Sequence, residues 1–329
     1  NKLVDSVPIS LFRDTHVAYV DLSFNQLTVQ LNSIKSHYLD HLDIGWNSLV
    51  FGSLSELAMA APNLSLLNLD HLELTGSSLL PITNMSGLQH LSMTGCLLDG
   101  NIGDFNVDGA LGQLRFLDLS ENRITGALAP NFFCQLPQLE HLSLRANFLE
   151  GMFPGLPISY CGFDSTLSFL DVSDNTFSDC RRLTKQKSHS SSLRFAKFSG
   201  NEWRTSFIIG QLLQHERGLQ ELECSACLLK GDITSVLESD TISTLPPLQV
   251  LRLDHNKLSG GDLSSLCVFQ QLVSVSAHNN RFTGVVPNCL LELPHLEFVD
   301  LSANSLSSFD TDVKVSEAIR HLVLHSNHL

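Results

Sequence analysis

The apolar positions of this chain recur with a period of about two dozen residues. In Leu114–Pro130, LRFLDLSENRITGALAP, three apolar residues are followed by Asn122 and then by Ile124. The same template fits thirteen times along the chain. The leading apolar residues of these repeats are Val17, Leu39, Leu64, Leu88, Leu114, Leu139, Leu167, Leu193, Leu219, Leu248, Leu272, Leu296 and Ile319. Internal self-similarity of this kind indicates a repeat array.

Each repeat predicts one short strand followed by an Asn turn. Apolar and polar residues alternate at the start of the repeat, so the apolar ones point inward and the intervening ones face solvent. The Asn that follows turns inward, where its amide can satisfy backbone groups of adjacent coils. We call this set the structural Asn ladder: Asn25, Asn47, Asn122, Asn147, Asn175, Asn201, Asn256, Asn280, Asn304 and Asn327. Leu72, Cys96 and Cys227 replace it in the other three repeats.

The residues after the ladder narrow the type of repeat. Three segments follow the ladder position: ITGALAP (124–130), LEGMFPG (149–155) and FTGVVPN (282–288). Two others end on the ladder Asn itself: LDLSEN (117–122) and VDLSAN (299–304). These segments resemble the plant-specific type of leucine-rich repeat (LRR), and the resemblance covers essentially the whole chain. LKGDITS (229–235) lacks the Pro and SLVFGSL (48–54) lacks the Gly at its place, so a protist with similar repeats is an alternative source.

The fold expected from these repeats is an α/β solenoid of about 13 coils. A single coil cannot bury its apolar face alone, so stacked neighbours make the core. The resemblance implies a curved horseshoe or superhelix with a parallel β-sheet on its concave face. We expect one domain over 1–329, since the phase is unbroken and 43% of residues are hydrophobic. Both ends fall at the N-x-L point of a repeat, so terminal caps are expected outside this segment, in a longer protein.

Charge and chemistry restrict the classes of function. The formal net charge of −14 argues against nucleic acid and anionic lipid as partners, and no apolar run is long enough to span a bilayer. One basic cluster, residues 181–187, is interpreted as a solvated loop or as a docking patch for an acidic surface. No phosphate loop, nucleophile elbow or H-E-x-x-H motif is present, so we expect neither an enzyme nor a cofactor.

The histidines and cysteines suggest structure more than chemistry. Asp254 and His278 share a column on adjacent coils, which predicts an ion pair or pH-responsive contact rather than a metal site. Cys224-x-x-Cys227 has a metal-like spacing, but both residues fall on core positions, as does Cys96.

Other features bear on the compartment. Cys134 and Cys161 lie on the far side of neighbouring coils, as do Cys267 and Cys289, and the sequence leaves open whether either pair is bridged. Sequons at Asn63 and Asn84 permit glycosylation. The resemblance implies an extracellular or cell-surface location, with a cytoplasmic one as the alternative.

Function is expected on the solvent-facing columns of the sheet. Phe116, His141, Phe169 and Phe195 are ring residues on successive coils and predict an aromatic stripe, although an aromatic at this position is also common repeat consensus. The candidate binding residues are Tyr19, Trp46, Phe116, His141, Arg145, Phe169, Asp171, Phe195 and Lys197.

Three functions are compatible with these features. By resemblance to receptor-like ectodomains and polygalacturonase-inhibiting proteins, the chain is expected to be a recognition module for a protein, peptide or glycan on the concave face. A structural scaffold subunit of a larger assembly is the alternative, since neighbours could cover uncapped ends. An intracellular LRR adaptor is a third reading, favoured only if every cysteine is free.

Overall fold

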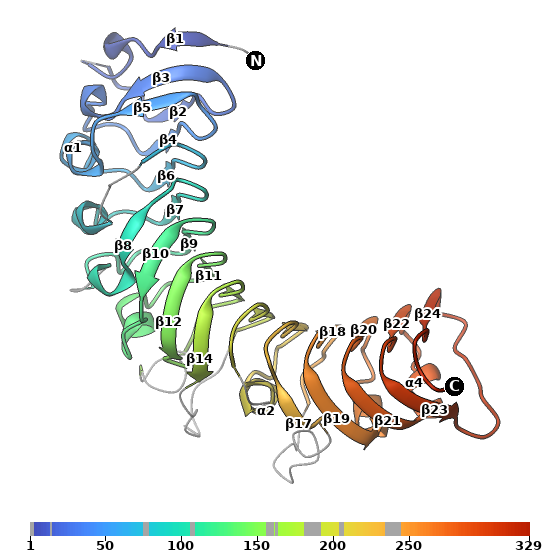
Figure 1. Cartoon of the computed structure of the whole chain (residues 1–329). Helices are drawn as coiled ribbons and strands as arrows, with labels where there is room; N and C mark the ends of the chain where they lie inside the picture. The colour runs from blue at the N-terminus through green and yellow to red at the C-terminus, as the bar shows by residue number, and fades with distance from the viewer. Residues whose placement is uncertain are drawn as a thin grey trace. The chain divides into compact units, whose positions relative to one another are not determined.

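The computed structural model describes residues 3–13, 15–74, 79–105, 109–155, 161, 164–180, 192–203, 207–233 and 245–329 (Figure 1). The chain divides into two compact units, Asn1–Leu167 and Ser168–Leu329. The basic cluster at 181–187 lies outside the described residues.

The repeats form a parallel β-sheet of thirteen strands, each three residues long, which confirms the predicted LRR solenoid. The first unit contributes β2 (Tyr19–Asp21), β4 (His41–Asp43), β6 (Leu66–Asn68), β7 (His90–Ser92), β9 (Phe116–Asp118) and β11 (His141–Ser143). The second unit contributes β13 (Phe169–Asp171), β15 (Phe195–Lys197), β16 (Glu221–Glu223), β18 (Val250–Arg252), β20 (Ser274–Ser276), β22 (Phe298–Asp300) and β24 (His321–Val323).

The register of these strands places equivalent residues side by side. His41 pairs with Tyr19 and with Leu66, for example, and Glu221 pairs with Phe195. From β2 to β22 the middle residue of each strand points into the core and is at most 5% exposed. The first and last residues therefore form columns on the solvent side.

A second strand follows the Asn ladder in most coils, where the sequence analysis expected only one strand per coil. In the first unit these strands are β1 (Val4–Ser6), β3 (Gln26–Gln30), β5 (Leu49–Phe51), β8 (Asp99–Asn101), β10 (Arg123–Gly126) and β12 (Phe148–Phe153). In the second they are β14 (Thr176–Cys180), β17 (Lys230–Asp232), β19 (Lys257–Asp262), β21 (Arg281–Val286) and β23 (Ser305–Phe309). The cause is a short alternation, in which buried Ile124 or Phe282 lies between exposed neighbours.

Short helices complete the coils. The α-helices are α1 (Leu54–Ala60), α2 (Phe207–His215) and α4 (Asn288–Leu291), and the 3₁₀ helices are η1 (Ile9–Leu11), η2 (Leu31–Ser33), η3 (Leu80–Asn84), η4 (Ile102–Asp104), η5 (Phe132–Gln135) and η7 (Leu263–Val268). Helix α1 begins with a capping box, because the Ser53 hydroxyl accepts from the Glu56 N–H and the Glu56 carboxylate accepts from the Ser53 N–H.

Each ladder Asn side chain joins its own coil to the preceding one. Asn122 accepts from the N–H groups of Cys96 and Leu98, both at 3.0 Å, and donates to the carbonyls of Met93 and Leu119 at 2.8 and 2.9 Å. Where Cys takes the ladder position its thiol replaces the amide as donor, since the Cys96 sulfur lies 3.0 Å from the Leu69 carbonyl.

The residue before each ladder position has a positive φ in all thirteen coils, at 51–58° for the non-glycine residues. This left-handed conformation costs a non-glycine residue about 1 kcal/mol. It is held by a hydrogen bond to the next coil: Trp46 and His71 donate their N–H groups to the carbonyls of Asp70 and Thr94, both at 2.7 Å. The turn therefore depends on the backbone rather than on residue type.

Two disulfides link neighbouring coils. Cys134 and Cys161 are bonded with a Cα–Cα distance of 5.0 Å, and Cys267 and Cys289 with one of 5.7 Å. The thiols of Cys96, Cys180, Cys224 and Cys227 are buried and not bridged. Burial raises the pKa of Cys96 and of Cys180 to about 12, so these thiols are inert packing groups.

Candidate functional site

The candidate site is the strand face, which we define as the solvent-facing residues of the thirteen strands and of the turn after each strand. Its residues come from equivalent positions of successive coils, so the strand register decides which side chains meet.

In the first unit, three rings form a row on β7, β9 and β11, which we call the His90 row. His90 and Phe116 stack with their ring centroids 4.0 Å apart, and Phe116 and His141 stack at 4.3 Å. All three side chains are half-buried. Burial lowers the pKa of His90, which favours the neutral ring that stacks as an aromatic.

Hydroxyl and charged groups flank this row. The Asp118 carboxylate accepts from the N–H and the hydroxyl of Ser120, and the Ser120 hydroxyl lies 2.6 Å from that of Ser143. Arg145, on the same column one coil on from Ser120, is exposed. The site thus presents fixed hydrogen-bonding groups beside half-exposed rings.

Tyr19 and Trp46 lie near the start of the first unit, apart from the His90 row. The Tyr19 ring stacks on His41 at 4.1 Å. Trp46 occupies a left-handed turn position and lies between Phe24 at 5.6 Å and His71 at 3.7 Å. Tyr19 and Trp46 were predicted from their columns, whereas the His41 and His71 rings that stack on them were not among the predicted binding residues.

In the second unit, Phe169 and Phe195 pair across β13 and β15 with centroids 6.3 Å apart. Asp171 is buried, and its carboxylate accepts from the Ser173 N–H at 2.9 Å. Of the four-ring stripe expected from the sequence, each unit holds one pair that lies in contact: Phe116 with His141, and Phe169 with Phe195.

Lys197 is already paired by residues that the sequence analysis did not select. Its ammonium lies 2.8 Å from the Glu221 carboxylate and 3.6 Å from that of Glu223, and Arg252 lies 3.4 Å from Glu223. Burial opposes the charge of Lys197, but the bond from Glu221 and the charges of both glutamates raise its pKa overall. Lys197 thus belongs to an ion-pair network, and its charge is already compensated by Glu221 and Glu223.

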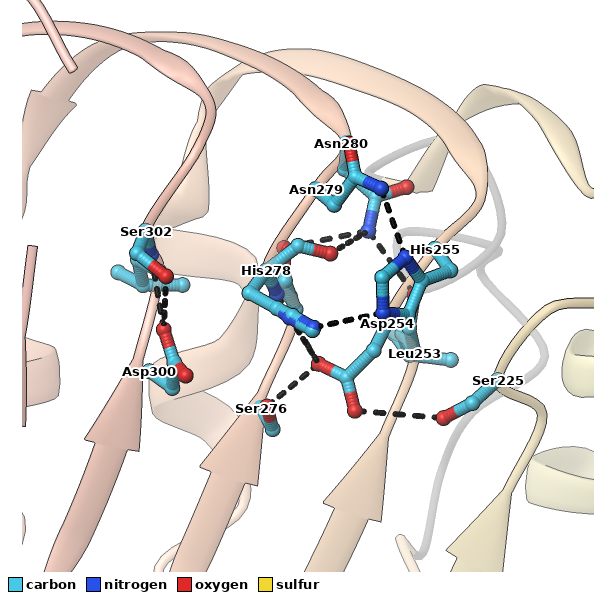
Figure 2. Close-up of polar contacts among 12 residues, drawn as sticks. Ser225, Leu253, Asp254, His255, Ser276, His278, Asn279, Asn280, Asp300 and Ser302 are labelled. Atoms are coloured by element: carbon cyan, nitrogen blue, oxygen red, sulfur yellow. Dashed lines mark hydrogen bonds and ion pairs between the residues drawn. The ribbon is translucent and has the colours of Figure 1, made fainter. Parts of the chain in front are cut away.

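A polar cluster surrounds Asp254 (Figure 2). Its carboxylate accepts from the Ser276 hydroxyl, from the Ser225 hydroxyl at 3.3 Å and from the His278 N–H at 3.0 Å. The His278 ring Nδ1 lies 3.9 Å from the same carboxylate, beyond hydrogen-bond distance. The expected contact between Asp254 and His278 is therefore made chiefly by the backbone of His278.

The His278 ring bonds instead to a second histidine (Figure 2). The Nε2 atoms of His278 and His255 lie 2.9 Å apart, and the Asn279 amide lies 2.7 Å from His255 Nδ1. If the Asn279 amide donates to His255 Nδ1, the neutral His255 ring has its hydrogen on Nε2. That N–H then donates a hydrogen bond to Nε2 of His278. Two rings at this distance share one hydrogen and hold each other in place.

Neither a metal centre nor a membrane span emerges from the part of the chain that the structure describes. Within it, no three His, Cys, Asp or Glu side chains gather closely enough to hold a metal ion. Its helices are all too short or too polar to cross a bilayer. The sequon residues Asn63 and Asn84 are exposed, and the Asn63 amide donates to the His37 carbonyl at 2.8 Å.

Comparison with known proteins agrees with the fold. The model of the Leucine Rich Repeat family matches residues 113–136 and 247–269. The chain is 31% identical over 199 residues to Receptor-like protein EIX1 of Solanum lycopersicum, covering 59% of this chain and 18% of that protein. It is 28% identical over 368 residues to Receptor like protein 24 of Arabidopsis thaliana, covering 88% of this chain and 42% of that protein. The chain thus spans less than half the length of these relatives.

Solved structures show the same architecture. A plant peptide hormone receptor, RGFR1 in complex with RGF2, aligns with a TM-score of 0.79 and 21% identity, over 99% of this chain and 50% of that one. The LRR ectodomain of GASSHO1/SCHENGEN3 from Arabidopsis thaliana, in complex with CASPARIAN STRIP INTEGRITY FACTOR 2, aligns at 0.75 and 23%, over 99% and 40%. At these identities the likeness concerns the fold. The chain is a leucine-rich-repeat protein, and the curated relatives that it matches are plant receptor-like proteins.

Proposed function

We propose that this chain is the recognition part of a receptor-like ectodomain and that it binds a peptide or protein segment on its strand face. The observation that carries the proposal is the His90 row, in which three stacked rings remain half-exposed on the solvent side of the first unit. Rings that pack on each other rather than in the core are rigid, amphipathic anchors of the kind that dominates binding interfaces.

The neighbouring columns suit a polypeptide. The half-exposed Asp118 carboxylate is fixed by its bonds from Ser120, whose buried hydroxyl also bonds that of Ser143, so Asp118 offers an acceptor to a peptide backbone without further ordering. Arg145 adds an exposed cation on the adjoining coil. The ligand would lie across successive strands, with apolar side chains on the rings.

The relatives and the cysteines support an extracellular place for this function. Curated relatives are named receptor-like proteins, and the solved structures of similar fold include receptors in complex with peptide hormones. The two disulfides fit an oxidising compartment and count against the intracellular adaptor, which required eight free thiols.

The test is a selection of displayed random linear peptides on the immobilised protein, followed by affinity measurements with synthetic copies of the selected peptides. Phe116→Ala should weaken their binding by about tenfold or more, because it removes the central ring of the row. Phe148→Ala is the matched control, since Phe148 is an exposed ring on β12, outside the strand face. Equal losses in both variants, or a loss with Phe148→Ala alone, would overturn the proposal.

A further inference from the structure

The first coils of the first unit carry a second ring surface, distinct from the His90 row. We call Tyr19, His41, Phe24, Trp46 and His71 the amino-terminal ring platform. Tyr19, Phe24 and Trp46 are 62%, 67% and 46% exposed, far more than the rings of the His90 row. Exposed rings of this size, gathered on one face, mark an interaction surface more often than chance.

The platform is built by two different backbone positions. Tyr19 and His41 begin strands β2 and β4, and their rings stack at 4.1 Å. Phe24, Trp46 and His71 occupy left-handed turn positions, where hydrogen bonds to the next coil fix the backbone. The solvent-facing part of the first coil thus begins with the Tyr19 ring and ends with the Phe24 ring. That of the second coil begins with His41 and ends with Trp46.

Glycine at position 95 makes room for the last ring. Gly95 takes the left-handed turn position one coil beyond His71, with a φ of 65°. A Cβ there would lie 2.7 Å from Nδ1 of the His71 ring. The ring row therefore ends at His71, which is held between Trp46 and the glycine backbone.

Acidic side chains lie between the two sets of rings. Asp21 and Asp43 follow Tyr19 and His41 by two residues, and Asp70 directly precedes His71. The coil segments 17–25, 39–47, 64–72 and 88–96 contain no Lys or Arg. The negative charge on this part of the strand face is therefore not balanced by cations from the same segments.

The carboxylates are crowded as well as unbalanced. The pKa of Asp43 is raised, first by burial and then by repulsion from Asp21 and Asp70, although the Gly45 N–H opposes the shift. A cation placed between these groups would relieve the repulsion. Asp70 keeps its orientation through bonds from the Ser92 hydroxyl at 2.7 Å and the Thr94 N–H at 2.8 Å.

We propose that the amino-terminal ring platform binds a basic segment of a partner polypeptide, with an Arg or Lys side chain lying on the ring of Trp46 and its charge facing Asp43 and Asp70. Charge complementarity selects this occupant, because exposed rings attract cations over their faces and carboxylates hold the charge. An anionic lipid surface would be repelled by the same acids. The inference rests on the proposed function of the strand face, but uses residues outside the His90 row.

The experiment uses three labelled synthetic peptides of equal length that alternate leucine with arginine, serine or glutamate. Fluorescence anisotropy should show binding of the arginine peptide and at least tenfold weaker binding of the other two. Asp43→Asn/Asp70→Asn and, separately, Trp46→Leu should each weaken the arginine peptide by about tenfold. The Asn variants retain an acceptor oxygen for the Ser92 and Thr94 bonds, and circular dichroism melting should confirm that they fold.

The matched control is Asp99→Asn/Asp104→Asn, which changes the net charge equally but at exposed acids of β8 and η4. It should bind the arginine peptide as the wild type does. Equal weakening in both double variants would show general attraction to an acidic protein, and equal affinity for the serine peptide would show non-selective ring contact. Either result overturns the inference.

Phe116→Ala separates the two proposals. If it leaves the arginine peptide unaffected while abolishing the selected peptides, both proposals stand. If the platform variants have no effect on the arginine peptide while Phe116→Ala still abolishes the selected peptides, only the platform fails. If Phe116→Ala has no effect on the selected peptides, the His90 row fails as their binding surface whatever the platform does.

Discussion

At the scale of single residues, the ladder Asn is a main source of side-chain bonds between coils in the repeats that have it. Asn122 is buried, and besides its bonds to Cys96, Leu98, Met93 and Leu119 it donates to the Ser120 carbonyl at 3.0 Å. Its bonding role could be predicted from the sequence, because the Asn recurs at a fixed position of the repeat and its amide carries both a donor and an acceptor. The left-handed residue before it could not be predicted, because Phe, Trp and Ala do not favour a positive φ.

Asn122→Ala should lower the free energy of unfolding by roughly 2–4 kcal/mol, because it leaves backbone N–H and carbonyl groups of two adjacent coils buried without partners. Chemical denaturation monitored by circular dichroism measures the change. Asn68→Ala is the control. The Asn68 amide donates to the Asp43 carboxylate and accepts from the Asp70 N–H, but it lies on the half-exposed strand face, where water can replace these bonds in the variant. A loss of less than 1 kcal/mol in Asn122→Ala would contradict the ladder's role.

Glu216, directly after α2, is fully buried, and burial raises the pKa of its carboxyl to about 8. The folded protein therefore retains a proton that the unfolded chain loses near its ordinary pKa of 4.5. Stability contributed by this protonated group should be fully present below about pH 4.5 and fall as pH rises towards 8.

Glu216→Gln should flatten this dependence, since an amide does not titrate. Urea unfolding near pH 5 and pH 8 should show a wild-type loss of roughly 2–4 kcal/mol that the variant lacks. Exposed Glu292→Gln should keep the wild-type slope. A wild-type protein equally stable at both pH values would show that Glu216 is ionised when folded.

At the scale of elements, the first strand of each coil could be predicted from the spacing of leucines, and the second strand could not. The alternation after the ladder is too short to distinguish a strand from a turn without its neighbours. Glycine permits the close approach of these second strands. At Gly284, with a φ of 82°, a Cβ would lie 2.2 Å from the Gly261 carbonyl oxygen of the adjacent strand.

The bridge between η7 and α4 should stabilise the second unit. Replacing Cys267 and Cys289 together by Ala should cost about 3 kcal/mol, as expected for a loop closed over 22 residues. Wild-type protein unfolded in dithiothreitol is the control. Its second unit should have the same free energy of unfolding as that of the variant if the Cys267–Cys289 bridge accounts for the difference. The offset of the two cysteines in their repeats left the pairing open from sequence alone.

At the scale of the whole molecule, the two disulfides and four buried thiols give a definite chemical count. Native protein treated with an alkylating agent should gain no adduct, while denatured protein without reductant should gain four. Intact mass before and after glycosidase treatment also shows whether Asn63 or Asn84 carries sugar. Adducts on native protein, or eight after denaturation alone, would contradict the arrangement and favour a reducing compartment.

The solenoid could be predicted from periodicity, since a pattern repeated thirteen times leaves little freedom in the fold, and the plant type of its repeats was implied by the resemblance of segments such as LDLSEN and ITGALAP. The candidate site was only partly predictable. Phe116 and His141 follow from their column, but the pairing of Lys197 with Glu221 depends on side-chain geometry. His255 and Asn279 approach each other because their turns are left-handed, and no residue pattern indicates that conformation.

The left-handed turn column has a consequence for how such a chain can change. A bond to the next coil holds its backbone at Phe24 and Glu121, for example, and Ala146 and Ser326 have nearly the same φ. Away from Gly95 and Gly200, where a Cβ would meet the preceding coil, side chains there can be exchanged at little cost to folding while the surface they display changes. The column is therefore the natural place to graft a new specificity, by evolution or by protein engineering, one coil at a time.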